Sequence, residues 1–123
     1  MKLAFCVKSA QEGGELDQRF GRAAAYALVD GDSGKELQRM ANPHKEASSS
    51  AGVGAVQMLS DAGVLGIVGP KMGPKALDAL RALGLEAWDQ GELDDLGKAY
   101  AAWAAHSLPK VDSTPKPAGL YRA

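Results

Sequence analysis

An unbroken apolar run, LAFCV at residues 3–7, constrains the fold more than any other feature of this sequence. A run this short and continuous is typical of a strand buried on both faces at the centre of a sheet. Two similar segments, residues 64–68 and 85–88, each follow a stretch whose apolar residues have helical spacing. Strands that alternate with helices in this way favour right-handed crossovers and parallel strands.

The remaining segments complete an element order of β-β-β-α-β-α-β-α. Residues 25–30 and 35–41 flank the turn sequence DGDSG and predict an antiparallel hairpin, whose second strand is polar and lies at an edge. Helical spacing predicts helices over about 51–62, from 74 to 84 and over 92–107. We therefore expect an α/β fold in which a mixed five-stranded sheet, a hairpin plus parallel strands, carries helices on both faces.

Length and composition predict one domain followed by a tail. The 123 residues suggest a single domain, which we place at residues 1–108. Residues 109–123 contain three prolines and no apolar period, so we expect a mobile tail there. Packing of this tail on the domain through Leu120 and Tyr121 is the alternative. The N-terminal apolar run is too short for a signal peptide or a membrane span, and we expect a soluble cytoplasmic protein.

Charge and composition argue against several classes of function. Fourteen basic and fifteen acidic residues give a net charge of −1, which argues against a protein that coats nucleic acid. The single cysteine, Cys6, lies in an apolar strand, where an inert buried thiol is expected. Two histidines far apart in sequence do not indicate a zinc site. The central strand has no carboxylate for two-metal chemistry, which argues against a nuclease of that type.

The stretch GPKMGPK, residues 69–75, combines features of an anion site at a junction between strand and helix. A helix N-terminus presents unpaired N–H groups and the positive end of the helix dipole. Gly69 and Gly73 would let a ligand approach the backbone, and Lys71 and Lys75 add charge. A tight turn with solvated lysines is the alternative. The stretch is not a Walker A loop, because Lys75 is followed by alanine.

Two further loops carry basic residues to the same expected edge of the sheet. Arg19 and Arg22 flank Phe20, and arginine forks suit multi-atom anions. We expect Phe20 to anchor its loop in the core. His44 and Lys45 precede serines that could cap the helix predicted from residue 51. An isolated histidine is more often a surface residue than a ligand, but this one shares its loop with a cation and a helix start.

The motifs LDQRFGRAAAYALVD, AGVGAVQMLSDAGV and VGPKMGPKALDALRALGLEAW occur in this order along the chain. Together they resemble the dinitrogenase iron–molybdenum cofactor biosynthesis family, the NifX/NifY-like domains, over about residues 1–105. The resemblance implies a ribonuclease-H-like motif fold. It also implies non-covalent binding or carriage of an anionic metal–sulfur cluster or its precursor, without catalysis. The cargo would be a molybdenum–copper sulfide cluster or an iron–molybdenum cofactor precursor, with cluster-assembly proteins as partners.

One position departs from the family pattern. Members often have D-x-H-F-G-R-A, whereas Arg19 stands here in place of the histidine. A potential metal ligand is thereby replaced by a cation, which favours electrostatic capture of a polyanion. Cluster sulfides would also tolerate an apolar neighbour such as Met72. The cluster-binding residues that we predict are Arg19, Arg22, His44, Lys45, Gly69, Lys71, Met72, Gly73 and Lys75.

Two other functions stay open from the sequence. The chain could be a metal-free interaction module that docks on a nitrogenase-like or cell-division partner, in which case the Pro-rich tail would matter more. It could also act on a phosphorylated small molecule through the anion site at residues 69–75. No residue near that site is a convincing general base, which makes this the weaker alternative.

Overall fold

The computed structural model describes residues 1–46 and 51–111. Its elements follow the expected order of strands and helices. They are β1 (Lys2–Val7), β2 (Ala25–Asp30), β3 (Glu36–Ala41), α1 (Ala51–Asp61), β4 (Gly66–Gly69), α2 (Pro74–Ala82), β5 (Glu86–Asp89) and α3 (Leu96–Ala104). Serines 48–50, which we expected to cap α1, lie outside the described residues.

The strands form one mixed five-stranded sheet with the order β3-β2-β1-β4-β5. Strand β1 is central, antiparallel to β2 and parallel to β4. Strand β3 pairs antiparallel with β2, and β5 pairs parallel with β4. The predicted mixed sheet is confirmed, and so is the polar edge strand, since β3 is mostly exposed.

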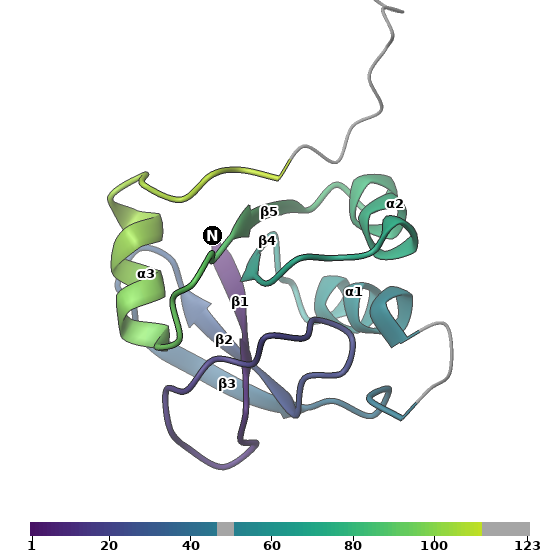
Figure 1. Cartoon of the computed structure of the whole chain (residues 1–123), viewed down its shortest axis with the longest axis horizontal. Helices are drawn as coiled ribbons and strands as arrows, with labels where there is room; N and C mark the ends of the chain where they lie inside the picture. Colours follow the sequence, from purple (N-terminus) through teal and green to yellow (C-terminus); the bar gives the residue numbers. More distant parts are fainter. Residues whose placement is uncertain (47–50, 112–123) are drawn as a thin grey trace, which may run out of the picture.

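Helices α1 and α2 cover one face of the sheet and α3 covers the other (Figure 1). Alternate residues of β1 enter the two cores: Ala4 and Cys6 pack with α1 and α2, whereas Leu3, Phe5 and Val7 pack with α3. All five side chains are fully buried. Full burial of a large apolar side chain stabilises the fold by about 1.5–3 kcal/mol. Because both faces of β1 are buried, residues 3–7 include no polar side chain.

Helix α3 begins at Leu96, four residues later than the periodicity predicts. The preceding residues are extended, because Glu15 and Asp95 form an antiparallel bridge and the N–H of Leu16 donates to the carbonyl of Asp94 at 2.9 Å. Asp95 then caps the helix by accepting a hydrogen bond from the N–H of Lys98. The loop after β1 is therefore fixed to the start of α3.

Residues 109–111, which we expected to begin the mobile tail, instead pair with β5. The N–H of Asp89 donates to the carbonyl of Pro109, and the N–H of Val111 donates to the carbonyl of Ala87. The Lys110 ammonium lies 5.9 Å from the centre of the Trp88 ring. The remaining residues of the expected tail, 112–123, lie outside the described part of the chain.

None of the helices within residues 1–46 and 51–111 has the length and apolar character that crossing a membrane requires.

Candidate functional site

Four loops emerge at the edge of the sheet where the parallel strands end. Val7 pairs with Ala25, and Ala25 pairs with Ala41, so the loops after β1 and β3 leave from the same edge. Gly69 and Asp89 end β4 and β5 beside them. Ligands of open α/β sheets bind outside the carboxyl ends of the strands. This edge is therefore the first place to search for a site.

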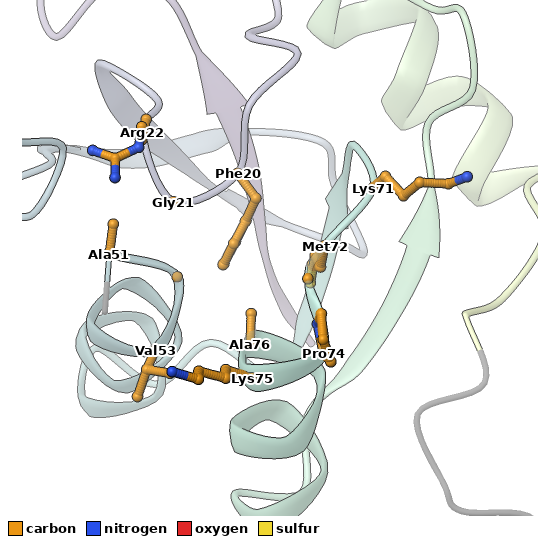
Figure 2. Close-up of a pocket in the computed structure, with 12 residues that line it drawn as sticks. Phe20, Gly21, Arg22, Ala51, Val53, Lys71, Met72, Pro74, Lys75 and Ala76 are labelled. Atoms are coloured by element: carbon orange, nitrogen blue, oxygen red, sulfur yellow. The ribbon is translucent and has the colours of Figure 1, made fainter. Parts of the chain in front are cut away.

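A cavity of about 430 Å³ opens at this edge, lined by residues 20–22, 51–53 and 71–76 (Figure 2). The first segment is the loop before β2, the second is the first turn of α1, and the third joins β4 to α2. Phe20 is 4% exposed and its ring lies 5.8 Å from that of Tyr26, centre to centre. The predicted core anchor is thus confirmed, and Phe20 also forms part of the cavity wall.

Small residues bring the backbones of these three segments close together. A Cβ atom on Gly21 would lie 2.6 Å from the backbone nitrogen of Gly52, and one on Gly52 would lie 3.0 Å from the Cβ of Ala76. Contacts this close leave no room for a larger side chain at Gly21. Gly52 was missed as a site residue; the small residues around it, AGVGA, were the available signal.

A buried amide holds the loop that carries Phe20 and Gly21. The Nδ2 of Asn42 donates to the carbonyls of Gly21 and Ala23, both at 2.9 Å. The hydroxyl of Tyr26 donates to the carbonyl of Phe20. Asn42 is 4% exposed and was not among the predicted site residues. Its role is to position the loop, because its Nδ2 donates to these carbonyls and to the Tyr26 hydroxyl, and Asn42 does not line the cavity.

Asp17 is a second buried polar group that shapes the same loop. Its carboxylate accepts hydrogen bonds from the backbone N–H and the Nε of Arg19, at 3.0 and 3.1 Å. Burial raises the pKa of Asp17, but the hydrogen bonds and charge of Arg19, with the N–H of Ala24, outweigh it and hold the pKa below its usual value. Asp17 is therefore expected to be ionised at neutral pH.

We expect Asp17→Asn to destabilise the protein by about 2 kcal/mol at pH 7, because the charged hydrogen bonds to Arg19 are lost. A carboxyl whose pKa is lowered by folding stabilises the protein above its unfolded pKa, about 3.9, and loses that contribution as pH falls through the folded value. In urea unfolding, the difference in stability between wild type and variant should be constant above about pH 5 and should shrink between pH 5 and pH 3.

Asp78→Asn is the matched control, since Asp78 forms an exposed ion pair with Arg81. Exposed ion pairs contribute little to stability, so Asp78→Asn should lower the free energy of unfolding by less than about 1 kcal/mol. A constant difference between Asp17→Asn and wild type across this pH range would contradict the assignment of an ionised, stabilising Asp17.

The start of α2 leaves backbone donors unused beside the cavity. Gly73 is the N-cap residue, its backbone is extended, and no side chain within residues 1–46 and 51–111 caps the helix. Pro74 occupies the first helical position, and the first turn has no acidic residue. The N–H groups of Lys75 and Ala76 therefore retain capacity for an anion, as helix N-termini generally do. Among the described residues, no atom lies within 4 Å of the place where a Cβ of Gly73 would project.

Five of the nine predicted residues line the cavity: Arg22, Lys71, Met72, Gly73 and Lys75. Their side chains do not all point the same way. In Figure 2, Lys75 extends toward Val53, on the α1 side of the cavity, and the guanidinium of Arg22 lies on the same side as Ala51. Lys71 extends in the opposite direction, away from Phe20 and Arg22. Its stem lines the cavity, but its charge lies outside.

Two more predicted cations, Arg19 and Lys45, border a neighbouring polar recess of about 280 Å³. Arg22 lines this recess as well as the cavity and therefore joins the two. The Nη1 of Arg22 donates to the carbonyl of Lys45 at 2.8 Å, which ties the two loops together. Glu46 also borders the recess and reduces its positive charge.

The structure places the last two predicted residues away from the cavity. Gly69 is buried at the end of β4, where its carbonyl accepts a hydrogen bond from the N–H of Gln90. His44 packs on α1 beside Gly54, in a different groove. Sharing a loop with Lys45 does not bring His44 to the same site, because adjacent residues of the loop face different grooves.

Conventional metal ligands do not gather in the part of the chain that the structure describes. No group of three or more His, Cys, Asp or Glu side chains there could hold a metal ion. Cys6 is fully buried, and burial, followed by the charge of Asp17, raises the pKa of its thiol far above the usual range. A ligand in the cavity would therefore be held by charge, backbone donors and apolar contact.

Comparisons with known proteins agree with this fold. The sequence profile of the family described as "Dinitrogenase iron-molybdenum cofactor" matches residues 1–106. The apo form of the orange protein from Desulfovibrio gigas is similar in structure, with a TM-score of 0.82 and 27% identity over 94% of this chain and 96% of that one. No curated protein sequence matches the chain.

Two more distant structures share the fold. One is a Thermotoga protein provisionally assigned as NifB, with a TM-score of 0.75 and 23% identity over 94% of this chain and 96% of that one. The other, from Methanocaldococcus jannaschii, is provisionally assigned as a dinitrogenase, with a TM-score of 0.66 and 14% identity over 91% and 95%.

Proposed function

The chain belongs to the dinitrogenase iron–molybdenum cofactor family, and we propose that it carries an anionic, molybdenum-containing metal–sulfur cluster in the cavity at residues 20–22, 51–53 and 71–76. The family is linked to the biosynthesis and carriage of this cofactor. The cluster is cargo and is held without covalent attachment. A molybdenum–copper sulfide cluster and an iron–molybdenum cofactor precursor are the two candidates.

The observation that carries the proposal is the meeting of two helix N-termini at one cavity. Residues 51–53 of α1 and 74–76 of α2 line it, and neither helix has an acidic residue in its first turn. Helix N-termini stabilise anions through the dipole and through free N–H groups. Arg22 and Lys75 add full charges beside them. Both the backbone and the side chains thus favour a polyanion.

The apolar part of the wall suits a cargo rich in sulfide. Phe20, Val53 and Met72 line the cavity with the cations. Sulfide ligands are large and polarisable, and they make weaker hydrogen bonds than phosphate oxygens do. A cluster that already carries its own sulfides needs no protein thiolate, which fits the buried and protonated state of Cys6. A phosphate ester would gain less binding free energy from these apolar side chains.

The test is reconstitution of the purified chain with tetrathiomolybdate and a copper salt. We expect molybdenum and copper to remain with the protein after gel filtration, in a fixed ratio, with visible absorption bands distinct from those of free tetrathiomolybdate. Tetrathiomolybdate with ferrous iron tests the second candidate. Protein that stays colourless and free of molybdenum in both mixtures would overturn the proposal.

A further inference from the structure

A second groove lies between the edge strand β3 and helix α1. Its volume is about 450 Å³, and it shares no lining residue with the cavity described above. Met40 of β3 and His44 of the following loop form one side. Gly54, Met58 and Asp61 form the other, at spacings that place them on one face of α1. The proposed cluster site does not account for this combination of residues.

His44 is held in the groove by its own loop and by a glycine. The side chain of Asn42 accepts a hydrogen bond from the backbone N–H of His44 at 2.9 Å. A Cβ atom on Gly54 would lie 2.9 Å from both the Cγ and the Nδ1 of His44. The imidazole therefore packs directly on the helix backbone, and any larger residue at position 54 would displace it.

The imidazole of His44 has no hydrogen-bond partner among residues 1–46 and 51–111. Met40 and Met58 are half-buried and pack against the core that α1 and α2 share. Two thioethers and one imidazole therefore line the same groove, and Asp61 supplies one negative charge at its exposed border. The groove thus offers soft donors that no interaction of the described residues uses.

We propose that Met40, His44 and Met58 form a binding site for a single Cu(I) ion. Thioethers ligate soft metals, imidazole suits copper, and hard cations such as Mg²⁺ require oxygen ligands. Zinc sites use thiolates, imidazoles and carboxylates, and thioethers do not replace them. The monovalent charge of Cu(I) matches a groove with one carboxylate. The site stands on different residues from the cluster cavity and does not depend on the function proposed for it.

The test is anaerobic titration of the protein with Cu(I) in competition with a chromophoric Cu(I) chelator. Methyl resonances of the four methionines report which thioethers bind. We expect one equivalent to bind and to shift the Met40 and Met58 methyl signals, while those of Met1 and Met72 stay in place. Met58→Leu keeps the side-chain volume and should weaken binding at least tenfold. His44→Gln should do the same, and His106→Gln should have no effect.

Cys6 is the competing ligand, because a thiol binds Cu(I) more strongly than a thioether. The titration is therefore repeated in Cys6→Ala, where binding and the two methyl shifts should persist. Loss of binding in Cys6→Ala would overturn the proposal, and so would an unchanged affinity in Met58→Leu. Lys75→Glu should retain Cu(I) binding, so failure of the copper site and failure of the cluster site are distinguishable.

Discussion

Gly21→Ala is expected to destabilise the fold by about 3 kcal/mol, the upper part of the range for overpacking a tight contact. The added methyl group would meet the nitrogen and Cα of Gly52 at 2.6 and 2.9 Å. Both are backbone atoms at the start of α1, so no side-chain rotation relieves the clash. The loop or the helix must move, and the hydrogen bonds from Asn42 to the loop oppose that movement.

The measurement is urea unfolding followed by circular dichroism, with Gly73→Ala as the matched control. No atom of the part of the chain that the structure describes lies within 4 Å of a Cβ at Gly73, and its φ of −75° suits any residue. Alanine is a poorer N-cap than glycine, but it also lowers the entropy of the unfolded chain. These two effects nearly cancel, and we expect Gly73→Ala to change the free energy of unfolding by less than about 0.5 kcal/mol. Equal stability of the two variants would contradict the close contact between Gly21 and Gly52.

The sheet could be predicted from the sequence because its signals are local. The run at residues 3–7 has no polar residue, and the structure buries both of its faces. The turn DGDSG sits between the paired strands β2 and β3. Burial and turn chemistry act over a few residues, so a short window of sequence contains them.

Pairings between distant segments were the part that the sequence did not reveal. The late start of α3 arises because Glu15 bridges Asp95, eighty positions along the chain. Apolar periodicity alone included Leu93 in the helix. In the structure, Leu93 lies in the loop before α3 and packs against the same core as α3 does. Likewise, Lys110 bridges Trp88 although its sequence context, Pro-Lys-Val, indicates a tail. Such contacts depend on tertiary structure and leave no local pattern.

The candidate site could likewise be predicted only in part. The sequence indicated which loops share an edge, and cations from three of them border the cavity and the recess. It could not indicate the directions of individual side chains. Lys71 and Lys75 belong to the same stretch, residues 69–75, yet Figure 2 shows them extending in opposite directions. The contact between Gly21 and Gly52 joins residues of separate motifs and was missed for that reason.

The two lysines provide a matched pair for the proposed cluster site. Lys75→Glu places a negative charge among the helix N-termini of the cavity, and we expect it to weaken binding of the tetrathiomolybdate–copper product at least tenfold. Lys71→Glu makes the same change in net charge at an equally exposed position. The Lys71 ammonium lies outside the cavity, so we expect Lys71→Glu to lower the affinity for the cluster by less than threefold.

Salt dependence separates a direct effect on binding from a general effect of charge. The ratio between the two variants should be largest at low ionic strength and should fall as salt screens the interaction, over a Debye length of about 10 Å at 0.1 M. Affinities are measured from the visible absorption of bound cluster at several salt concentrations. Equal losses in both variants would show that only net charge matters. A larger loss in Lys71→Glu would move the site to the groove that Lys71 shares with Asp89 and Lys110.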